Sequence, residues 1–291
     1  MALRGELIQQ ASLARYTSWR VGGAARQLYR PADLADLRVF LQGLPADEAL
    51  LWVGLGSNLL IRDGGFNGTV IITAGLLQAM QVEGVTITAD SGVYCSKLAR
   101  QAAKSGLSGA AFLAGIPGTL GGALAMNAGA HGAEIWDYVQ QATTIDRQGQ
   151  LHTRSASEFA VSYRHVAIPE GEWFVSATLT FTAGDSASES RLIRELLKKR
   201  NNSQPTNQPC AGSVFRNPPG DHAGRLIESS GLKGLRIGGA SVSEKHANFI
   251  VNDGTASAAD IENLIALVQQ KVEQMQNITL IPEVHVMGEY A

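Results

Sequence analysis

The chain has 291 residues, more than one typical domain, which predicts two or three small domains. Hydrophobic residues make up 45% of the sequence and charged residues 17%, a balance that excludes wholesale disorder. The 24 Lys and Arg residues against 26 Asp and Glu residues give a net charge of −2. The total charge therefore gives no argument for binding nucleic acid or an acidic membrane.

Targeting and metal signals are weak. The N-terminal segment has an acid at Glu6 and no apolar run, so we expect no secretory signal. The two cysteines, Cys95 and Cys210, are far apart, and the six histidines form no HxxxH pair, so we expect no metal site. So few cysteines also favour a location in the reducing cytoplasm. The uncharged stretch 105–130 contains seven glycines and Pro117, which favours buried loops over a membrane helix.

The first two thirds of the chain alternate between strand and helix patterns. Leucines spaced three and four residues apart predict an amphipathic helix over 31–44. Short apolar runs predict strands, and a second helix is expected to stop before Gly106. The expected strands cover 50–53, 59–61, 70–72, a segment beginning at 85, and 175–181, and the second helix covers 95–104.

The last third differs in charge. Small polar residues over 182–190 predict a boundary, and a helix is expected over 189–200. From Arg191 to Lys245 ten basic residues stand against four acidic ones, a local charge of +6. A final helix is expected to begin at Ser257, where Ser257 and Asp260 have the spacing of a capping box. We therefore predict domains at 1–78, 79–187 and 188–283, with the tail 284–291 free to return to the first.

A glycine-rich segment, Gly54-Leu55-Gly56-Ser57-Asn58-Leu59, follows the strand at 50–53. Glycines allow successive backbone N–H groups to converge, so this segment is a candidate nest for phosphate oxygens. It is not a dinucleotide fingerprint of the G-x-G-x-x-G type, because Leu59 replaces the third glycine and no helix is expected to follow. A plain glycine-rich hairpin remains an open alternative.

A second glycine-rich segment contains Gly115-Ile116-Pro117-Gly118 and Gly121-Gly122, and continues to Asn127 and Gly129. So many glycines beside a rigid proline indicate backbone pressed against a flat or phosphorylated ligand. The alternative is close packing of small residues in a core. Two such segments without a Rossmann unit suggest a dinucleotide that is held by strands and loops.

Three polar spots lie outside these segments: the pair Tyr163-Arg164, Ser213 and Glu283. Ser213 is not in a G-x-S-x-G elbow, so a hydrolase nucleophile is poorly supported. Glu283 stands in an apolar tail, where an acid is costly unless it is paired or functional. Taken singly, each spot is better explained by structure than by catalysis.

Together, eight motifs resemble the UDP-N-acetylenolpyruvoylglucosamine reductase family over residues 12–288. Their order in the chain is Thr17-Ser-Trp-Arg-Val-Gly-Gly23, Gly54-x-Gly-Ser-Asn58, Ala114-Gly-Ile-Pro-Gly-x-x-Gly-Gly122, Asn127-Ala-Gly129, Tyr163-Arg164, Ala211-Gly-Ser213-x-Phe-x-Asn217-Pro218, His246-Ala-Asn-Phe249 and Pro282-Glu-Val284. The resemblance implies an α+β protein with an FAD-binding region of the vanillyl-alcohol-oxidase (PCMH) type and an α+β substrate-binding domain. It also implies a cytoplasmic enzyme of peptidoglycan precursor synthesis.

The resemblance further implies that noncovalent FAD is held by the two glycine-rich segments and that NADPH is the reductant. The implied substrate is an enolpyruvyl ether of a UDP-sugar, which becomes UDP-N-acetylmuramate. Ser213 is implied as the proton donor, with Arg164 and Glu283 acting on the substrate carboxylate. Tyr163 and Asn217 are implied substrate ligands, and Arg200 and Lys245 are our choices for contacts to the diphosphate.

The sequence departs from the family pattern at two positions. Val166 and His285 stand where the family commonly has serine and arginine, and the second change weakens the expectation of a fixed cation beside Glu283. The short distance from Arg164 to the helix at 189 leaves no room for a tyrosine-bearing lid, which indicates the shorter subclass.

Two other functions stay open at this point. One is an FAD-dependent alcohol oxidase on the same scaffold. The other is a nucleic-acid-binding module, but the basic region offers only Phe215 for stacking. We therefore expect no nucleic-acid or membrane partner, no metal, and a monomer.

Overall fold

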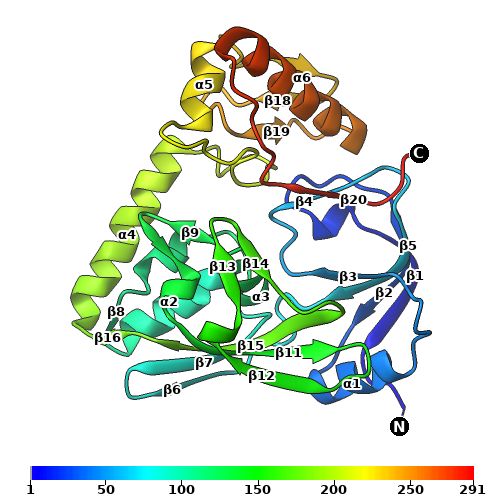
Figure 1. The fold of residues 1–291 in the computed structure, drawn as a ribbon, viewed down its shortest axis with the longest axis vertical. Coiled ribbons are helices and arrows are strands. Elements are labelled where there is room, and N and C mark those ends of the chain that lie inside the picture. Colours follow the sequence, from blue (N-terminus) through cyan, green and yellow to red (C-terminus); the bar gives the residue numbers. More distant parts are fainter. Residues whose placement is uncertain (1) are drawn as a thin grey trace. The chain divides into compact units, whose positions relative to one another are not determined.

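The computed structural model describes residues 2–291, which divide into two compact units. Unit 1 comprises residues 2–8, Gln27–Leu55 and Gly68–Lys199, and unit 2 comprises Gln9–Arg26, Gly56–Asn67 and Arg200–Ala291. The elements of both are labelled in Figure 1. The domain boundaries expected from the sequence stay a prediction.

The main sheet of unit 1 has five antiparallel strands. Their order is β12 (Leu151–Ser155), β11 (Val139–Asp146), β15 (Glu172–Thr180), β7 (Thr86–Asp90) and β6 (Met80–Glu83) (Figure 1). In β15, Val175, Ala177 and Leu179 are buried and alternate with less buried polar residues. The strand expected over 175–181 is therefore confirmed, and its period-two pattern reflects one face packed on a core.

Helical segments pack on this sheet. They are α2 (Cys95–Lys104), the 3-10 helix η2 (Ala111–Gly115) and α3 (Leu120–Ala125), and α3 contacts β15 and β7. Their buried side chains are mostly alanine and leucine, which allows close approach to the sheet. The helix expected over 95–104 is confirmed. Within residues 2–291, no helix has the length and apolar character needed to cross a membrane.

A second sheet has the order β1 (Glu6–Ser12), β2 (Ala24–Arg30), β5 (Phe66–Ile72) and β3 (Leu50–Val53), with β3 parallel to β5. In unit 1 the helix α1 (Leu34–Gln42) contributes Leu37, Phe40 and Leu41 to a core that includes Tyr29 and Ile71. The helix is shorter than expected, because the Asp33 side chain caps it at Asp36 and Gly43 ends it.

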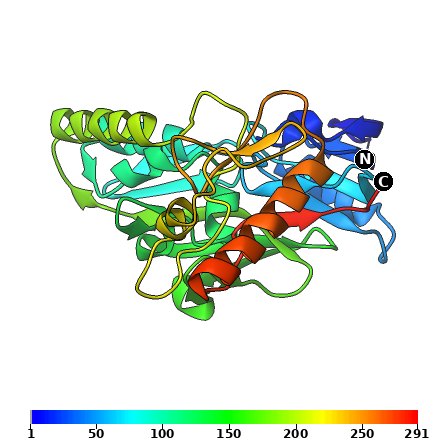
Figure 2. The ribbon, with the colours of Figure 1, turned by 90° about the horizontal axis from the view of Figure 1, so that it is seen from above.

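Unit 2 contains the long helix α6 (Ala258–Gln276), shown in orange and red in Figure 2. The Ser257 capping box is confirmed, and Ile261, Leu264, Ile265, Val268 and Val272 are buried as expected. They form a core with α5 (Ala223–Ser229) and the sheet β17 (Arg236–Ile237), β18 (Ala240–Val242) and β19 (Ile250–Asn252).

The C-terminal segment of unit 2 pairs with a segment from early in the chain. The strand β20 (His285–Met287) runs parallel to β4 (Leu59–Ile61), with Val286 opposite Leu60. The Arg62 guanidinium stacks on the Tyr290 ring, 4.1 Å from its centroid, and pairs with Glu262 of α6 at 2.8 Å. These contacts fix the backbone that follows Glu283.

The remaining elements are short, apart from α4 (Ser186–Ser203), which is longer at both ends than the helix expected over 189–200. They are η1 (Ala14–Tyr16), β8 (Leu107–Ser108), β9 (Gly129–Ala130), β10 (Ala133–Glu134), η3 (Ile135–Asp137), η4 (Ala156–Glu158), β13 (Ala160–Ser162), β14 (His165–Ala167) and β16 (Thr182–Ala183). The hairpin β13–β14 carries Tyr163 and Arg164 in its turn.

Candidate active site

In unit 2, Ser213 and Glu283 lie on neighbouring extended segments. The backbone N–H of Glu283 donates to the carbonyl of Val214 at 2.8 Å, and the N–H of Arg216 donates to the carbonyl of Ile281 at 2.9 Å. This antiparallel pairing is continued by a bridge between Phe215 and Pro282. The backbone therefore places Glu283 beside the residue that directly follows Ser213.

A buried asparagine holds the other edge of the Ser213 segment. Asn248 is 3% exposed, and its side-chain amide donates to the Phe215 carbonyl at 2.8 Å and accepts from the Phe215 N–H at 3.0 Å. Its own carbonyl accepts from the Val214 N–H at 2.9 Å. The asparagine side chain thus replaces a partner strand, which fixes the backbone after Ser213.

The first glycine-rich segment contributes two residues next to these segments in unit 2. The Asn58 amide donates to the Glu283 carbonyl at 3.0 Å, and the Asn58 carbonyl accepts from the His285 N–H at 3.0 Å. The Ser57 carbonyl accepts from the Gly212 N–H at 3.4 Å. Ser57 and Asn58, predicted as cofactor ligands, therefore lie against the predicted proton donor segment and the predicted acid.

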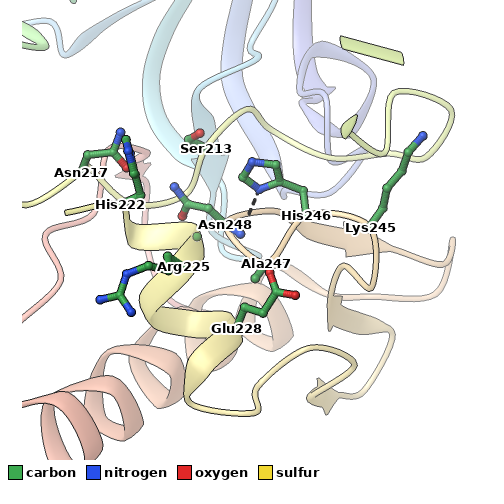
Figure 3. Close-up of a pocket in the computed structure, with 10 residues that line it drawn as sticks. Ser213, Asn217, His222, Arg225, Glu228, Lys245, His246, Ala247 and Asn248 are labelled. Carbon is green, nitrogen blue, oxygen red and sulfur yellow. Dashed lines mark hydrogen bonds between the residues drawn. The ribbon is translucent and has the colours of Figure 1, made fainter. Parts of the chain in front are cut away.

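A pocket with a volume of about 370 Å³ opens beside Ser213 (Figure 3). Its lining is polar and carries both charge signs: Ser213, Asn217, His222, Gly224, Arg225, Glu228, Lys245, His246, Ala247 and Asn248. Burial, with a smaller effect from Lys233, lowers the pKa of His246 from its ordinary value, which favours the neutral ring. The pocket therefore brings together Ser213, Asn217 and Lys245.

Arg200 lies on a neighbouring part of the same unit. Its Nε donates to Gln204 Oε1 at 3.0 Å, and burial lowers its pKa from the ordinary arginine value. The Lys245 ammonium donates to the backbone carbonyl of Asn201, the residue that follows Arg200. Burial also raises the pKa of the Cys210 thiol, which donates weakly to the Pro205 carbonyl at 3.6 Å.

In unit 1, Arg164 is held by the backbone and side chains of the segment 127–134, and it also lies against Tyr163 of its own hairpin. Its guanidinium donates to the carbonyls of Asn127 and Gly129 at 3.1 and 3.3 Å, and to Glu134 Oε1 at 3.2 Å. The side chain is 15% exposed, and its carbon Cζ lies 4.8 Å from the ring centroid of Tyr163. The backbone of Arg164 has a positive φ of 56°, an uncommon conformation for a residue other than glycine.

The two glycine-rich segments meet in unit 1. A Cβ at Gly54 would lie 2.3 Å from Thr119 Oγ1, so only glycine fits there. Thr119 is 1% exposed, and its hydroxyl has no hydrogen-bond partner among residues 2–291. The buried Ser91 hydroxyl, beside Gly121, is likewise unpaired within that part of the chain. Unpaired buried hydroxyls cost free energy unless a ligand accepts from them.

Comparisons with known proteins agree with these motifs. A family model described as an FAD binding domain matches residues 25–155, and one described as the C-terminal domain of UDP-N-acetylenolpyruvoylglucosamine reductase matches residues 204–287. Proteins of that name from Alkalilimnicola ehrlichii and Legionella pneumophila (strain Corby) are 57% and 56% identical to this chain, over 98% of it and 96% and 94% of their own lengths. The chain belongs to the UDP-N-acetylenolpyruvoylglucosamine reductase family.

A solved structure of a family member supports the fold over the whole chain. The crystal structure of the reductase from Thermus caldophilus superposes with a TM-score of 0.84 at 34% identity, covering 98% of this chain and 99% of that one. The α+β fold with an FAD-binding region, as expected from the sequence, is confirmed. The chain is an FAD-dependent oxidoreductase, as members of this family are.

The residues around the glycine-rich segments fit an FAD. Thr119 and Ser91 lie beside Gly54 and Gly121, and their buried hydroxyls have no hydrogen-bond partner within residues 2–291. Neither hydroxyl was predicted, although Thr119 stands inside the second segment. Among residues 2–291, no group of three or more His, Cys, Asp and Glu side chains is arranged to hold a metal ion.

Several pocket residues were also missed by sequence reasoning. His246 and Asn248 belong to a motif of the resemblance, but no role was assigned to them. His222, Arg225 and Glu228 were missed because only the fold of α5 and the loop before it brings them to Ser213 (Figure 3). His285 stands where the family commonly has arginine. Burial, with a smaller effect from Arg216, lowers the pKa of His285, which favours the neutral ring.

Proposed function

We propose that this protein reduces UDP-N-acetylglucosamine enolpyruvate to UDP-N-acetylmuramate with NADPH, in peptidoglycan precursor synthesis. Family membership over nearly the whole chain supports the substrate class. The observation that carries the proposal is the pairing of the Ser213 segment with Glu283 beside a polar pocket. A hydroxyl and a carboxyl group held on adjacent backbone segments suit proton transfer next to a substrate carboxylate.

FAD held by the two glycine-rich segments would supply hydride transfer to the terminal vinyl carbon of the substrate, with NADPH as the reductant. Arg164 then faces the negative charge that develops on the substrate carboxylate, and Glu283 hydrogen-bonds to the same group. Ser213 gives its hydroxyl proton to the carbon that bears the ether oxygen. The fixed guanidinium of Arg164 supports its role, because a positioned cation stabilises charge without reorganising.

The pocket beside Ser213 takes the nucleoside diphosphate in this proposal. Lys245 and Arg225 bring positive charge to it, and Asn217 and the neutral His246 offer hydrogen bonds. Tyr163 and Arg200 remain proposed substrate contacts. The glycine-rich segments, with the residues assigned to them from the sequence, remain the proposed FAD ligands. A cytoplasmic location, a monomeric state and the absence of nucleic-acid and membrane partners also remain predictions.

Product analysis tests this function. The purified protein, NADPH and UDP-N-acetylglucosamine enolpyruvate are incubated without oxygen, and the sugar nucleotide is weighed by mass spectrometry. We expect the mass to increase by that of two hydrogen atoms, one equivalent of NADPH being consumed for each product. The rival alcohol oxidase would consume oxygen with simple alcohols and leave the enolpyruvyl ether unchanged, which would contradict the proposal.

A further inference from the structure

The segment 127–134, which holds Arg164 and contains the short strands β9 and β10, ends in an acidic residue, Glu134, to which the sequence analysis assigned no role. Its two carboxylate oxygens have different partners: Oε1 accepts from Arg164 Nη1 at 3.2 Å, and Oε2 accepts from Asn127 Nδ2 at 2.6 Å. The carboxylate therefore links the arginine to a buried asparagine. We propose that Glu134 is a positioning residue, which holds the Arg164 guanidinium in the orientation that the substrate carboxylate needs.

Asn127 makes this link rigid. It is 2% exposed, its amide also donates to the Ser162 carbonyl at 3.2 Å, and its Oδ1 accepts from the Trp136 N–H at 3.4 Å. Ser162 lies in the hairpin that carries Arg164. The asparagine thus ties the hairpin, the loop and Glu134 together, so the carboxylate has a fixed place from which to hold the guanidinium.

The backbone around the ion pair is closely fitted. A Cβ at Gly129 would lie 2.9 Å from Glu134 Cγ and 3.3 Å from Arg164 Nη1. Asn127 and Arg164 both have positive φ angles, 45° and 56°, although neither is glycine. Such conformations cost free energy and persist where the surroundings fix them, which is consistent with a pre-organised site.

The charge of Glu134 gives the proposal a distinctive kinetic signature. A carboxylate beside Arg164 opposes the attraction of the substrate carboxylate, so removing its charge should not weaken ground-state binding. Removing the charge should nevertheless let the long arginine side chain sample other rotamers. The guanidinium would then stabilise the developing charge of the transition state less well, which lowers kcat. We therefore expect Glu134→Gln to lower kcat without raising KM for the sugar nucleotide.

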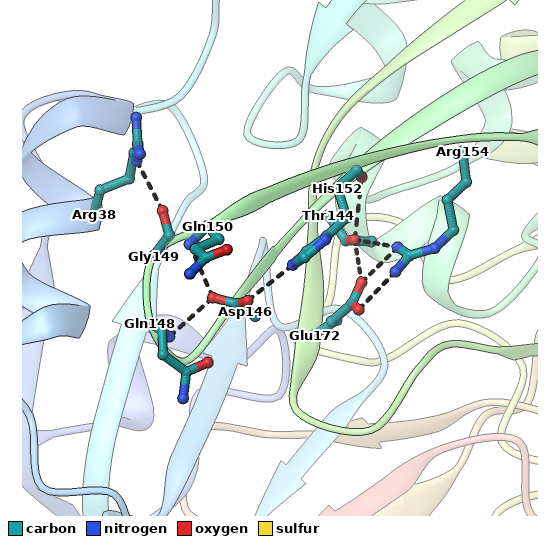
Figure 4. Close-up of polar contacts among 9 residues, drawn as sticks. All are labelled: Arg38, Thr144, Asp146, Gln148, Gly149, Gln150, His152, Arg154 and Glu172. Carbon is teal, nitrogen blue, oxygen red and sulfur yellow. Dashed lines mark hydrogen bonds and ion pairs between the residues drawn. The ribbon is translucent and has the colours of Figure 1, made fainter.

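The test compares Glu134→Gln with Glu172→Gln in the holoenzyme. Glu172 forms a similar ion pair in unit 1, accepting from Arg154 Nη1 at 2.6 Å and Nη2 at 2.8 Å (Figure 4). Flavin content, thermal unfolding, reduction by NADPH and reoxidation by the sugar nucleotide are measured for each. We expect Glu134→Gln to slow reoxidation about 10- to 100-fold with normal reduction, and Glu172→Gln to change stability alone.

A double-variant cycle with Arg164→Ala completes the test. If Glu134 acts through the arginine, Glu134→Gln should cost no further reoxidation rate once Arg164 is absent. Additive losses, an equal slowing of both half-reactions, a raised KM with unchanged kcat, or the same behaviour as Glu172→Gln would each overturn the proposal. If Glu134→Gln does not fold, Glu134→Asp is held to the same criteria, because it keeps the charge and shortens the reach.

This inference rests on the proposed function, and the wild-type protein separates the two. A wild type that is not reoxidised by the sugar nucleotide contradicts the reductase proposal. A wild type that is reoxidised normally, together with an unaffected Glu134→Gln variant, contradicts only the role of Glu134.

Discussion

The two regions that carry the proposed catalytic residues hold them in different ways. In unit 1, Arg164 is fixed through its side chain, by two loop carbonyls and the Glu134 carboxylate. In unit 2, Ser213 and Glu283 lie on segments that are fixed through the backbone. A cation on a long flexible chain needs side-chain partners to have one orientation, whereas a short hydroxyl side chain follows its backbone. Variants near each region should therefore fail for different reasons.

The largest difference between the two regions is expected when a methyl group is added beside Arg164 or beside Ser213. Gly129→Ala would place a Cβ 2.7 Å from the Ala133 carbonyl oxygen and 3.3 Å from Arg164 Nη1. Gly212→Ala, next to Ser213, would meet no protein atom within 4 Å. We expect Gly129→Ala to lower the free energy of unfolding by about 1–3 kcal/mol, and Gly212→Ala to change it by less than about 0.5 kcal/mol. Thermal unfolding of both variants measures this, and equal losses would contradict the account.

The backbone support of unit 2 is tested at Asn248. Asn248→Asp keeps the acceptor for the Phe215 N–H but turns a donor into an oxygen that faces the Phe215 carbonyl. We expect a loss of about 1–2 kcal/mol in the free energy of unfolding, because a buried carbonyl loses its partner. Asn207→Asp makes the same chemical change at an exposed position and is the control. Denaturant unfolding that gave the same loss of free energy for both variants would exclude support of the Phe215 backbone by Asn248.

Salt should affect substrate binding by the cationic residues of the open pocket. Lys245 and Arg225 line an open pocket, where added ions screen their attraction for a diphosphate. We expect KM for the sugar nucleotide to rise a few-fold between low and high salt, with a smaller change in kcat. Steady-state kinetics over a salt series measure this. A KM that is indifferent to salt would argue against a diphosphate in this pocket.

The smallest effect expected is a pH dependence of stability from His246. Burial, with a smaller effect from Lys233, lowers its pKa in the folded protein below the ordinary value of 6.5. As pH falls below that value, the unfolded chain binds more protons than the folded protein, so stability decreases toward acid. His246→Asn should remove this part of the decrease in unfolding experiments between neutral and mildly acidic pH. An unchanged profile would mean that the ring does not titrate differently on folding.

Several elements of the fold were predictable from the sequence because their signals are local, whereas FAD was implied by the resemblance of eight motifs over residues 12–288. The Ser257 capping box, the alternation of β15 and the glycine-rich segments all show within a few consecutive residues. The strands β1, β2 and β11 were missed, because their buried residues do not alternate regularly along the strand. Thr119 could have been singled out, because it lies between glycines in a predicted ligand segment.

The residues that position the candidate catalytic groups could not be predicted from the sequence. Glu134 meets Arg164 across thirty positions, and Asn248 meets Phe215 across thirty-three. No periodicity or spacing indicates such partners, because they depend on how loops close and not on local propensity. The departure at His285 was visible, but the nearby charge of Arg216 became clear only when the 281–285 segment was seen paired with the 214–216 segment.

The central claim is that Ser213 gives a proton to the substrate carbon, and stopped-flow measurement of Ser213→Ala tests it most directly. Reduction of the flavin by NADPH needs no proton from this residue, whereas product formation does. We predict a normal reductive half-reaction and a reoxidation by the sugar nucleotide that is slower by about 10²–10⁴-fold. Cys210→Ala, which removes the nearby thiol, should leave both half-reactions close to normal. Normal reoxidation of Ser213→Ala, or its loss in Cys210→Ala, would contradict the account.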